Sequence, residues 1–414
     1  MKTKNLAIVI LSLLTVSVYS QFEQDQLSGD DFEKIKVSVG GAFALQYQIL
    51  DHEADSALIP MGSGFNLPTA NFNLDADLAK GISLNLVTYL SSRHHNEAWV
   101  KGGYLLIDEL PFIKSDAVDK LMDYLTLRVG EMELNYGDGH FRRSDNGNVI
   151  YNPFVGNYVM DAFTTAPALE LMFRNNGLLA MGALTTGSVK QEFVTFRNNQ
   201  YTAYDNHKEL GFYWKLGYDK EFNEDFRGRL TISGFHLPED NHNGTLYSGD
   251  RAGSRYYLVM NRVTNSTTDV DIKSNHLSGR FGPGTTRKNN SFMFNLFTNW
   301  KGFELFGTYE LASGNTALGN EFDFNQFAAE ALYRFGGENQ FYLGGRYNVV
   351  NGDPNTAVEG DQSVRRYQIG AGWFLLKSTV LKIEYVDQDF TDFIPNYGAE
   401  AGFNGFMVEA GIAF

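Results

Sequence analysis

The chain has 414 residues and a formal net charge of −15, with 42 Gly, 33 Phe and 22 Tyr but only 9 Pro. So acidic a chain is a poor nucleic-acid binder, and without cysteine it forms no disulfide and does no thiolate chemistry. Beyond the N-terminus, no apolar run is long enough to cross a bilayer as a helix.

Residues 1–20 have the pattern of a cleaved signal peptide. Lys2 and Lys4 precede an apolar run over 6–14, and residues 18–20 form a cleavage-site region that ends in a small residue just before Gln21. We therefore expect an exported protein with a periplasmic N-terminal segment over 21–33.

Strict alternation begins at residue 35 and predicts an unusually long strand. Apolar side chains occupy one face, at Ile35, Val37, Val39, Phe43, Leu45, Tyr47 and Ile49, while the other face is mostly small or polar. A soluble half-buried strand averages about five or six residues, so this length favours a tilted strand that crosses a membrane.

The same period continues along the chain, interrupted by tight turns and long polar segments in alternation. Upward strands are predicted to start near 34, 81, 124, 178, 226, 302, 340 and 379, each followed by a downward strand. The long segments are 50–64, 91–97, 136–165, 187–207, 237–289, 312–321, 351–362 and 391–401. Short periplasmic turns and long extracellular loops are typical of an outer-membrane barrel.

We therefore predict an all-β fold, a transmembrane antiparallel β-barrel of about 16 strands over 34–414. The segment 254–263 and its successor could add a hairpin, which would make about 18 strands. A secreted β-sandwich is the alternative architecture, but it does not account for the long apolar faces or the asymmetry of turns and loops.

One connection on the short-turn side differs from the others. Residues 111–123 include the sequence SDAVDKLMD, in which Val118, Leu121 and Met122 have helical spacing and Ser115 is a candidate N-cap. We predict a small periplasmic helix there.

The inward face of the predicted strands defines a lumen with both signs of charge. Its predicted lining residues are Arg128, Lys215, Arg227, Arg229, Glu304, Glu330, Arg334, Arg346, Arg366, Lys382 and Glu384. Mixed charge suits a water-filled channel better than a pocket for an apolar ligand. Equally, each of these residues could simply pair with a neighbour and brace the wall.

The long loop 136–165 is the predicted constriction. It is rich in turn-forming residues yet carries Phe141, Tyr151, Phe154, Val155, Tyr158 and Val159, which indicates that it packs back against the inside of the wall. That would bring Asp138, His140, Arg142, Arg143 and Asp145 towards the pore axis as an electrostatic filter. An outward loop that contacts other molecules is the alternative.

No motif for catalysis emerges. We find no nucleophile elbow, and a membrane-embedded hydrolase would need a Ser and a His placed together near one girdle of the barrel, which the sequence does not show. His94 and His95, and the acidic loop around Asp240, lack regular ligand spacing. We therefore expect no enzyme activity, no metal and no cofactor.

The last strand alternates from Phe406 to Phe414 and ends on an aromatic residue. Outer-membrane barrels of diderm bacteria usually finish in this way, so we expect Phe414 to act as the signal for the barrel-assembly machinery.

Two stretches resemble the outer-membrane porins of the phosphate-selective O and P type found in Bacteroidota. They are YLTLRVGEMELNYG at 124–137 and YQIGAGWFLLKSTVLKIEYV at 367–386, and Arg128 and Gly130 match family positions. The resemblance implies a 16-stranded, often trimeric channel. The family's anion filter is basic, whereas this chain is acidic and mixes Glu with Arg in the lumen, which favours a general porin role.

The sequence thus predicts a porin in the bacterial outer membrane for passive diffusion of small hydrophilic solutes or ions. Its expected partners are outer-membrane lipid and lipopolysaccharide, the assembly machinery and further copies in a homotrimer, without nucleic acid. The alternative is a structural or secretion-associated barrel that binds a protein partner, with loop 237–289 and segment 111–123 as the contact regions.

Overall fold

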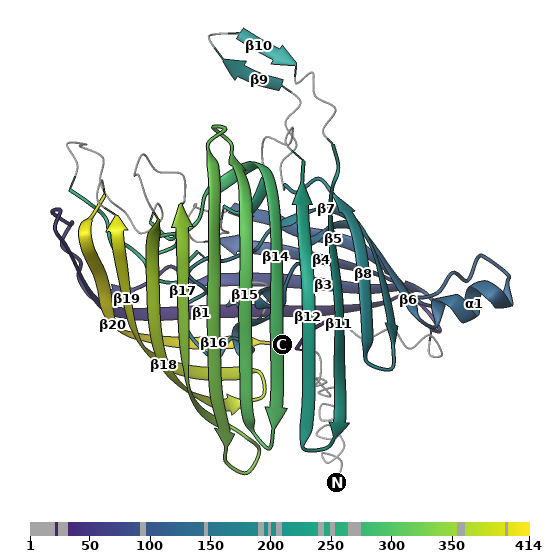
Figure 1. The fold of residues 1–414 in the computed structure, drawn as a ribbon. Helices are drawn as coiled ribbons and strands as arrows, with labels where there is room; N and C mark the ends of the chain where they lie inside the picture. The colour runs from purple at the N-terminus through teal and green to yellow at the C-terminus, as the bar shows by residue number, and fades with distance from the viewer. Residues whose placement is uncertain are drawn as a thin grey trace.

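The computed structural model describes residues 21–23, 32–91, 97–144, 148–188, 194–197, 200–203, 209–238, 244–248, 253–263, 275–353, 361–393 and 396–414. Within these residues, sixteen antiparallel strands form the wall of a closed barrel (Figure 1). They are β1 (Lys36–Ala54), β3 (Thr69–Ala79), β4 (Ile82–Ser91), β5 (Glu97–Ile107), β6 (Leu125–Glu133), β7 (Thr165–Asn175), β8 (Leu178–Thr185), β11 (Gly211–Asn223), β12 (Phe226–Leu237), β14 (Gly284–Trp300), β15 (Phe303–Thr316), β16 (Glu321–Phe335), β17 (Phe341–Asp353), β18 (Gln362–Leu376), β19 (Thr379–Phe393) and β20 (Gly398–Ala413).

The barrel closes because β1 pairs with β3 on one side and with β20 on the other. Tyr47 lies opposite Val408 in the closing pair, and the Phe414 backbone exchanges hydrogen bonds of 2.9 and 3.0 Å with Gly41. The predicted fold class and the count of 16 strands are therefore confirmed, and the terminal strand takes part in closing the wall.

Alternation along each strand sets which side chains face outwards. On β11, Phe212 and Leu216 are about half exposed, whereas the intervening Tyr213 and Lys215 are completely buried. On β20, Phe406 is exposed and Glu409 is buried. Outward side chains of this kind suit a hydrocarbon environment, and the polar ones are directed into the barrel.

The predicted positions of the strands agree closely with the structure. The upward strands begin at residues 36, 82, 125, 178, 226, 303, 341 and 379, and tight turns join each downward strand to the next upward one, except between β5 and β6. The long connections gather at the opposite end, where β9 (Val194–Arg197) and β10 (Gln200–Ala203) form a hairpin that projects beyond the wall (Figure 1).

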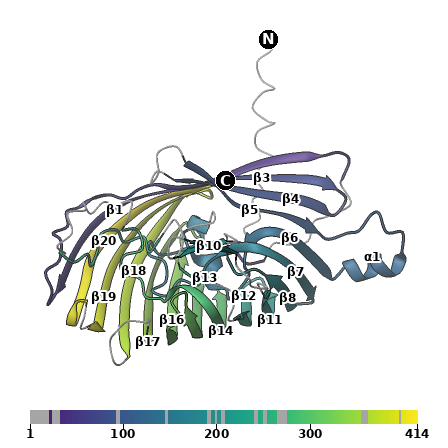
Figure 2. The ribbon, with the colours of Figure 1, turned by 90° about the horizontal axis from the view of Figure 1, so that it is seen from above.

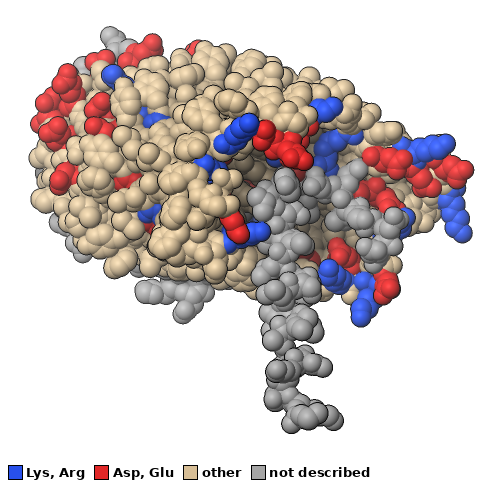
Figure 3. All heavy atoms as spheres, turned by 90° about the horizontal axis from the view of Figure 1, so that it is seen from below, with Lys and Arg blue, Asp and Glu red and all other residues tan. Residues whose placement is uncertain are grey.

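The predicted helix exists at the exceptional short-turn connection. α1 (Asp116–Met122) begins after Ser115, whose side chain makes no capping hydrogen bond, and Asp116 and Asp119 lie in its first turn. Seen from below, Lys, Arg and acidic side chains gather at the end of the molecule that carries α1, acidic side chains also gather at the opposite end, and much of the surface between them has no charge (Figure 3).

The alternative of about 18 strands is wrong, because residues 254–263 do not cross the membrane. Arg255, Leu258 and Met260 have φ values of +76°, +66° and +60°, which an extended strand does not permit. Their segment lies inside the barrel instead, where Tyr256 and Tyr257 are fully buried.

Gly130 provides a direct test of the pairing between β5 and β6. Its φ is +144°, and a Cβ there would lie 2.3 Å from the carbonyl oxygen of Gly103. We expect Gly130→Ala to destabilise the barrel by about 1–3 kcal/mol, because the wall cannot shift without breaking its ladder. The midpoint of urea unfolding in lipid vesicles measures this. Gly182→Ala on β8 is the matched control, since nothing lies within 4 Å of the added carbon. An equal response in both variants would contradict the expectation.

Candidate functional site

The lumen is the candidate site, and the described residues of loop 134–164 lie inside it. This loop joins β6 to β7 and contains η2 (Gly139–Arg142) and η3 (Asn148–Ile150). Its backbone is held by wall side chains: Val159 N–H donates to Asn348 at 2.8 Å and Met160 N–H to Gln326 at 3.1 Å. The loop thus crosses the interior instead of standing above the barrel.

Loop 238–283 also enters the lumen, as far as its described residues show. β13 (Gly244–Tyr247) pairs in antiparallel fashion with the first residues of β14. Further along the loop, the Gly253 carbonyl accepts a hydrogen bond of 2.9 Å from the Asn157 side chain. Phe281 N–H donates to the Val159 carbonyl at 3.0 Å, so the two loops bind each other. Viewed from above, chain segments lie within the ring of strands (Figure 2).

The first ionic cluster attaches loop 134–164 to β15, β16 and β17; we call it the Arg142 cluster. The guanidinium of Arg142 contacts Glu304 at 2.8 Å and Glu330 at 3.0 Å, while Arg334 and Arg346 hold the other oxygens of these carboxylates at 3.0 and 2.9 Å. Burial alone would lower the pKa of Arg142, but Glu330 and Glu304 raise it above its ordinary value. Arg142 therefore stays charged and tied to the wall.

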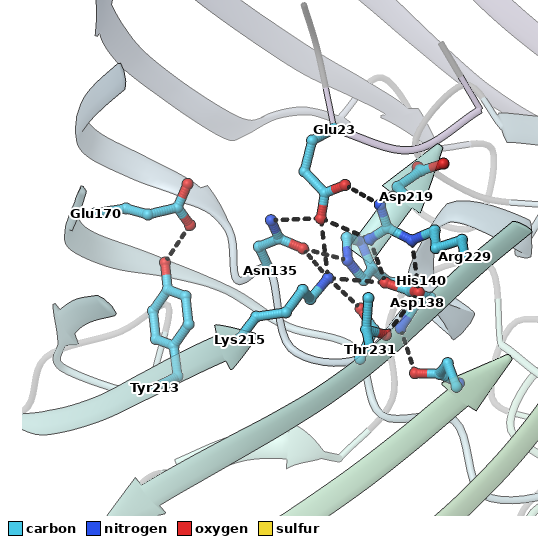
Figure 4. A network of polar contacts seen from close by, with 12 residues as sticks. Glu23, Asn135, Asp138, His140, Glu170, Tyr213, Lys215, Asp219, Arg229 and Thr231 are labelled. Atoms are coloured by element: carbon cyan, nitrogen blue, oxygen red, sulfur yellow. Dashed lines mark hydrogen bonds and ion pairs between the residues drawn. The ribbon is translucent and has the colours of Figure 1, made fainter. Parts of the chain in front are cut away.

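A second cluster forms around Asp138 and is drawn in Figure 4. The Asp138 carboxylate accepts hydrogen bonds from Lys215 at 2.9 Å, from the guanidinium of Arg229 at 2.8 Å and from the Thr231 hydroxyl at 2.8 Å. Glu23, from the N-terminal segment, binds the same Arg229 and Lys215. We call Glu23, Asp138, Lys215 and Arg229 the Asp138 cluster.

Both carboxyl groups of the Asp138 cluster are ionised far below neutral pH. Burial by itself would raise the pKa of Asp138, but the charges of Arg229 and Lys215 outweigh it and hold that pKa well below its usual range. The pKa of Glu23 is lowered too, since the same two cations overcome the effect of burial.

A pH dependence follows from these two groups. A carboxyl with a depressed pKa stabilises the folded state fully above its unfolded pKa of about 4, and the contribution is lost as the pH falls through the folded value. We expect these two groups to leave the urea midpoint unchanged between about pH 8 and about pH 5 and to lower it below about pH 4. Asp138→Asn removes one titrating group, so the urea midpoint of this variant should fall less steeply below about pH 4 than that of the wild type. A steep loss already between pH 7 and pH 5 would contradict this account.

A third cluster attaches loop 238–283 to the seam of the barrel. Glu409 on β20 accepts from Lys382 at 2.7 Å, from Gln46 at 2.7 Å and from Arg255 of the loop at 3.2 Å. Lys382 also donates to the Val149 carbonyl of the other inner loop at 2.6 Å. The buried pair of Lys382 and Glu409 therefore connects both inner loops to β19 and β20.

An apolar core fills the lumen towards the long-loop end. Loop residues Val159, Tyr256 and Phe281 belong to one buried cluster with the inward-facing Phe324 and Phe403 of the wall. Phe281 and Phe324 meet edge to face with centroids 5.6 Å apart. The described part of the lumen is packed like a protein interior at this level.

The predicted lining residues all lie on the inner face, but most of them are not in contact with water. Eight are at most 3% exposed: Lys215, Arg229, Glu304, Glu330, Arg346, Arg366, Lys382 and Glu384. Arg128, which binds Glu170 at 3.0 Å, is partly exposed, as are Arg227 and Arg334. Each has an ionic or hydrogen-bonded partner, so in this conformation they brace the wall and the inner loops.

The predicted constriction residues separate into different contacts. Asp138, His140, Arg142 and Arg143 are buried within the barrel, and Asp145 lies outside the described residues. Arg143 binds Asp161 of its own loop with Nε at 3.0 Å from the carboxylate, and His140 Nε2–H donates to the amide oxygen of Asn135 at 3.0 Å. Arg142 and Arg143 therefore do not share one set of carboxylates, and the role of these residues in a constriction stays a prediction.

Below the clusters, a cavity of about 1120 Å³ opens at the short-turn end; we call it the vestibule. Gln21, Arg227, Phe297, Asn299, Glu304 and Arg334 are among the residues that line it. The vestibule reaches the Arg142 cluster through Glu304 and Arg334, and Ile150 and Tyr151 of loop 134–164 also line it, so open space extends from this end to the inner loop.

Sequence reasoning missed two parts of the lumen. For segment 254–263 the pattern predicts a possible hairpin, although its run of Tyr, Leu, Val and Met is the same signal that indicates an inner position for loop 136–165. The position of Phe22 and Glu23 inside the barrel has no signal in the sequence, since a single Phe-Glu pair is common. Residues 1–20, the predicted signal peptide, lie outside the described residues.

The described residues offer no cluster of three or more His, Asp or Glu side chains that could bind a metal. His94, His95 and Asp240 lie outside them. Among the described helices, none has both the length and the apolar character needed to cross a membrane.

Known proteins resemble this chain in structure but not in sequence. No protein-family model matches it, and neither does any curated protein. OmpT of Vibrio cholerae in its trimer form is similar with a TM-score of 0.51 and 11% identity, over 92% of this chain and 100% of that one. An anion-selective porin from Comamonas acidovorans has a TM-score of 0.51 and 12% identity over the same shares. The outer-membrane channel DcaP of Acinetobacter baumannii has a TM-score of 0.50 and 9% identity, over 95% and 100%.

At such identities the likeness shows the fold. The chain is a multi-pass barrel of the outer-membrane type with a porin-like architecture.

Proposed function

We propose that this protein is an outer-membrane porin through which small hydrophilic solutes or ions diffuse passively. The observation that carries the proposal is a closed 16-stranded barrel whose lumen holds charged clusters that adjoin a vestibule of about 1120 Å³. The structural neighbours include a porin and a channel of the outer membrane, which supports the same function.

The inner loops set the width of the passage in this proposal. Arg142 and Arg255 each attach one loop to the wall, and both side chains are completely buried. A pore that remains between such tightly packed loops passes small solutes only. Single-channel conductance should accordingly be low for a barrel of this size.

We further propose weak ion selectivity instead of phosphate selectivity. In each cluster the cations meet carboxylates at salt-bridge distance: Arg142 with Glu304 and Glu330, and Lys382 with Glu409. Because the charges of such pairs largely cancel, the lumen favours neither cations nor anions strongly. The resemblance to the O and P type porins of Bacteroidota, carried by Arg128 and Gly130, concerns the barrel and its diffusion role.

Three further expectations belong to this proposal. The chain acts without enzyme activity or cofactor, it assembles as a homotrimer in lipid and lipopolysaccharide, and the barrel-assembly machinery receives its last strand through Phe414. Phe414 is 70% exposed next to the seam, which makes its ring accessible to another protein. The OmpT neighbour is described in a trimer form.

A structural or secretion-associated barrel is the second candidate, and the packed lumen favours it. Eight of the predicted lining residues are shielded from water, and apolar loop residues fill the long-loop half. A barrel that serves as a binding platform needs no continuous water path.

Planar bilayers distinguish the two candidates. The mature protein should give small, discrete, ohmic current steps and a reversal potential close to zero under a KCl gradient. Correctly folded protein that gives no steps would support the binding platform, and a large reversal potential of either sign would contradict weak selectivity.

A further inference from the structure

The N-terminal residues Gln21, Phe22 and Glu23 occupy the lumen in the way a ligand occupies a site. The Glu23 carboxylate meets the guanidinium of Arg229 end on, with distances of 2.7 and 2.9 Å to its two terminal nitrogens. Lys215 lies 3.2 Å from the same carboxylate. The Glu23 side chain is only 6% exposed, so it is bound and not merely placed nearby (Figure 4).

A third donor completes the carboxylate site. The Asn135 side chain donates to Glu23 at 3.3 Å from the start of loop 134–164. Lys215 and Arg229 lie on β11 and β12, next to each other in the wall. The donors therefore belong to the barrel wall and its inner loop, not to the N-terminal segment that they bind.

An aromatic pocket lies beside the carboxylate site and holds Phe22. Its ring meets Phe297 and Phe141 edge to face, with centroids 5.2 and 5.6 Å apart. The guanidinium groups of Arg229 and Arg227 lie 4.3 and 5.3 Å from the same ring. Fork-like binding of a carboxylate next to a pocket of this kind selects for an anion with an apolar neighbour.

The charge balance shows what Glu23 contributes. Without it, the three cations Lys215, Arg227 and Arg229 face only Asp138 and Asp219. The emptied site would carry an excess positive charge and would adjoin the vestibule, because Gln21 and Arg227 line that cavity. Buried positive charge in contact with water attracts an anion.

We propose that Lys215, Arg229 and Asn135, with Phe297 and Phe141, form a binding site for small solutes that carry a carboxylate beside an apolar group, and that Phe22 and Glu23 are its tethered occupant. The inference rests on the proposed channel function, because such solutes would reach the site through the vestibule. The N-terminal segment competes with them for it.

Calorimetry with a peptide probe tests the site without requiring conduction. The probe is acetyl-Gln-Phe-Glu-amide, whose only charge is the side-chain carboxylate, and acetyl-Gln-Phe-Gln-amide is its neutral control. In the detergent-solubilised full barrel, Phe22→Ala with Glu23→Ala should bind the charged probe about tenfold or more tightly than the wild type does, and should bind the neutral probe weakly. Glu33→Ala removes an exposed carboxylate from the same N-terminal region and should behave like the wild type.

Two further variants keep the test decisive. Glu23→Gln alone, which preserves the shape of the side chain, should also increase binding of the charged probe, and adding Lys215→Met to the double variant should abolish the gain. Equal binding of both probes by the emptied barrel, or no binding, would overturn the site. A barrel that binds the charged probe but gives no current steps would overturn the channel function and leave the site standing.

Discussion

Replacing residues 253–262 with a Gly/Ser linker of equal length is expected to raise the single-channel conductance by about threefold or more. This segment fills the lumen with side chains that are completely buried, including Arg255, Tyr256 and Tyr257. Tyr256 donates to Glu384 at 2.6 Å, and the Tyr257 backbone exchanges hydrogen bonds with Gln48. The linker lacks the Arg255 and Tyr256 side chains that bind the wall and the ring of Tyr257 that fills the lumen, and it keeps only backbone hydrogen bonds such as those to Gln48, so the passage widens.

The hairpin of β9 and β10 provides the control for this replacement. Residues 194–203 have the same length but project beyond the wall (Figure 1), so exchanging them for the same linker should leave the conductance unchanged. Folding of both variants is checked by heat-dependent mobility on gels. If the 253–262 variant folds and conducts like the wild type, the segment does not restrict the passage.

The second large effect is expected on stability, from Asp138→Ala. The carboxylate of Asp138 neutralises Lys215 and Arg229, both at most 3% exposed. Its removal leaves two buried cations with fewer partners, which should cost about 3–5 kcal/mol of unfolding free energy. Urea unfolding in lipid vesicles measures the loss, and Asp138→Asn should recover part of it through its remaining hydrogen-bond acceptor.

An exposed ion pair gives the matched comparison. Asp225 lies 3.4 Å from Lys301 in neighbouring turns, and both side chains are more than half exposed. Asp225→Ala should change the unfolding free energy by less than about 1 kcal/mol, since solvent screens such pairs. Similar losses in the two variants would show that the Asp138 cluster does not anchor loop 134–164.

The wall of the barrel was predictable because its signal is local. Alternation with a period of two and tight turns placed the strand starts near their observed positions, and the inward side of Lys215 and outward side of Phe212 followed from the same pattern. The small helix around Asp116 was also predictable from its spacing.

The filling of the lumen was less predictable because it depends on contacts between distant residues. Arg255 binds Glu409, which lies 154 positions later in the chain, and no sequence pattern near either residue predicts this ion pair. The sequence pattern around an inward-facing arginine is also the same whether the guanidinium contacts pore water or a buried carboxylate. Alternation predicts on which face of the sheet a side chain lies, but not whether that side chain contacts solvent or other residues.

The direct test of the channel is the current through a barrel that carries one reactive thiol in the vestibule. The chain has no cysteine, so Asn299→Cys introduces a single thiol among the residues that line the cavity. Leu296→Cys on the same strand, 48% exposed on the outer face, is the control. We predict discrete current steps in both variants and a reduced step size only for Asn299→Cys after a bulky cationic thiol reagent is added. Steps that are absent, or that stay unchanged after the vestibule thiol has reacted completely, would contradict conduction through this lumen.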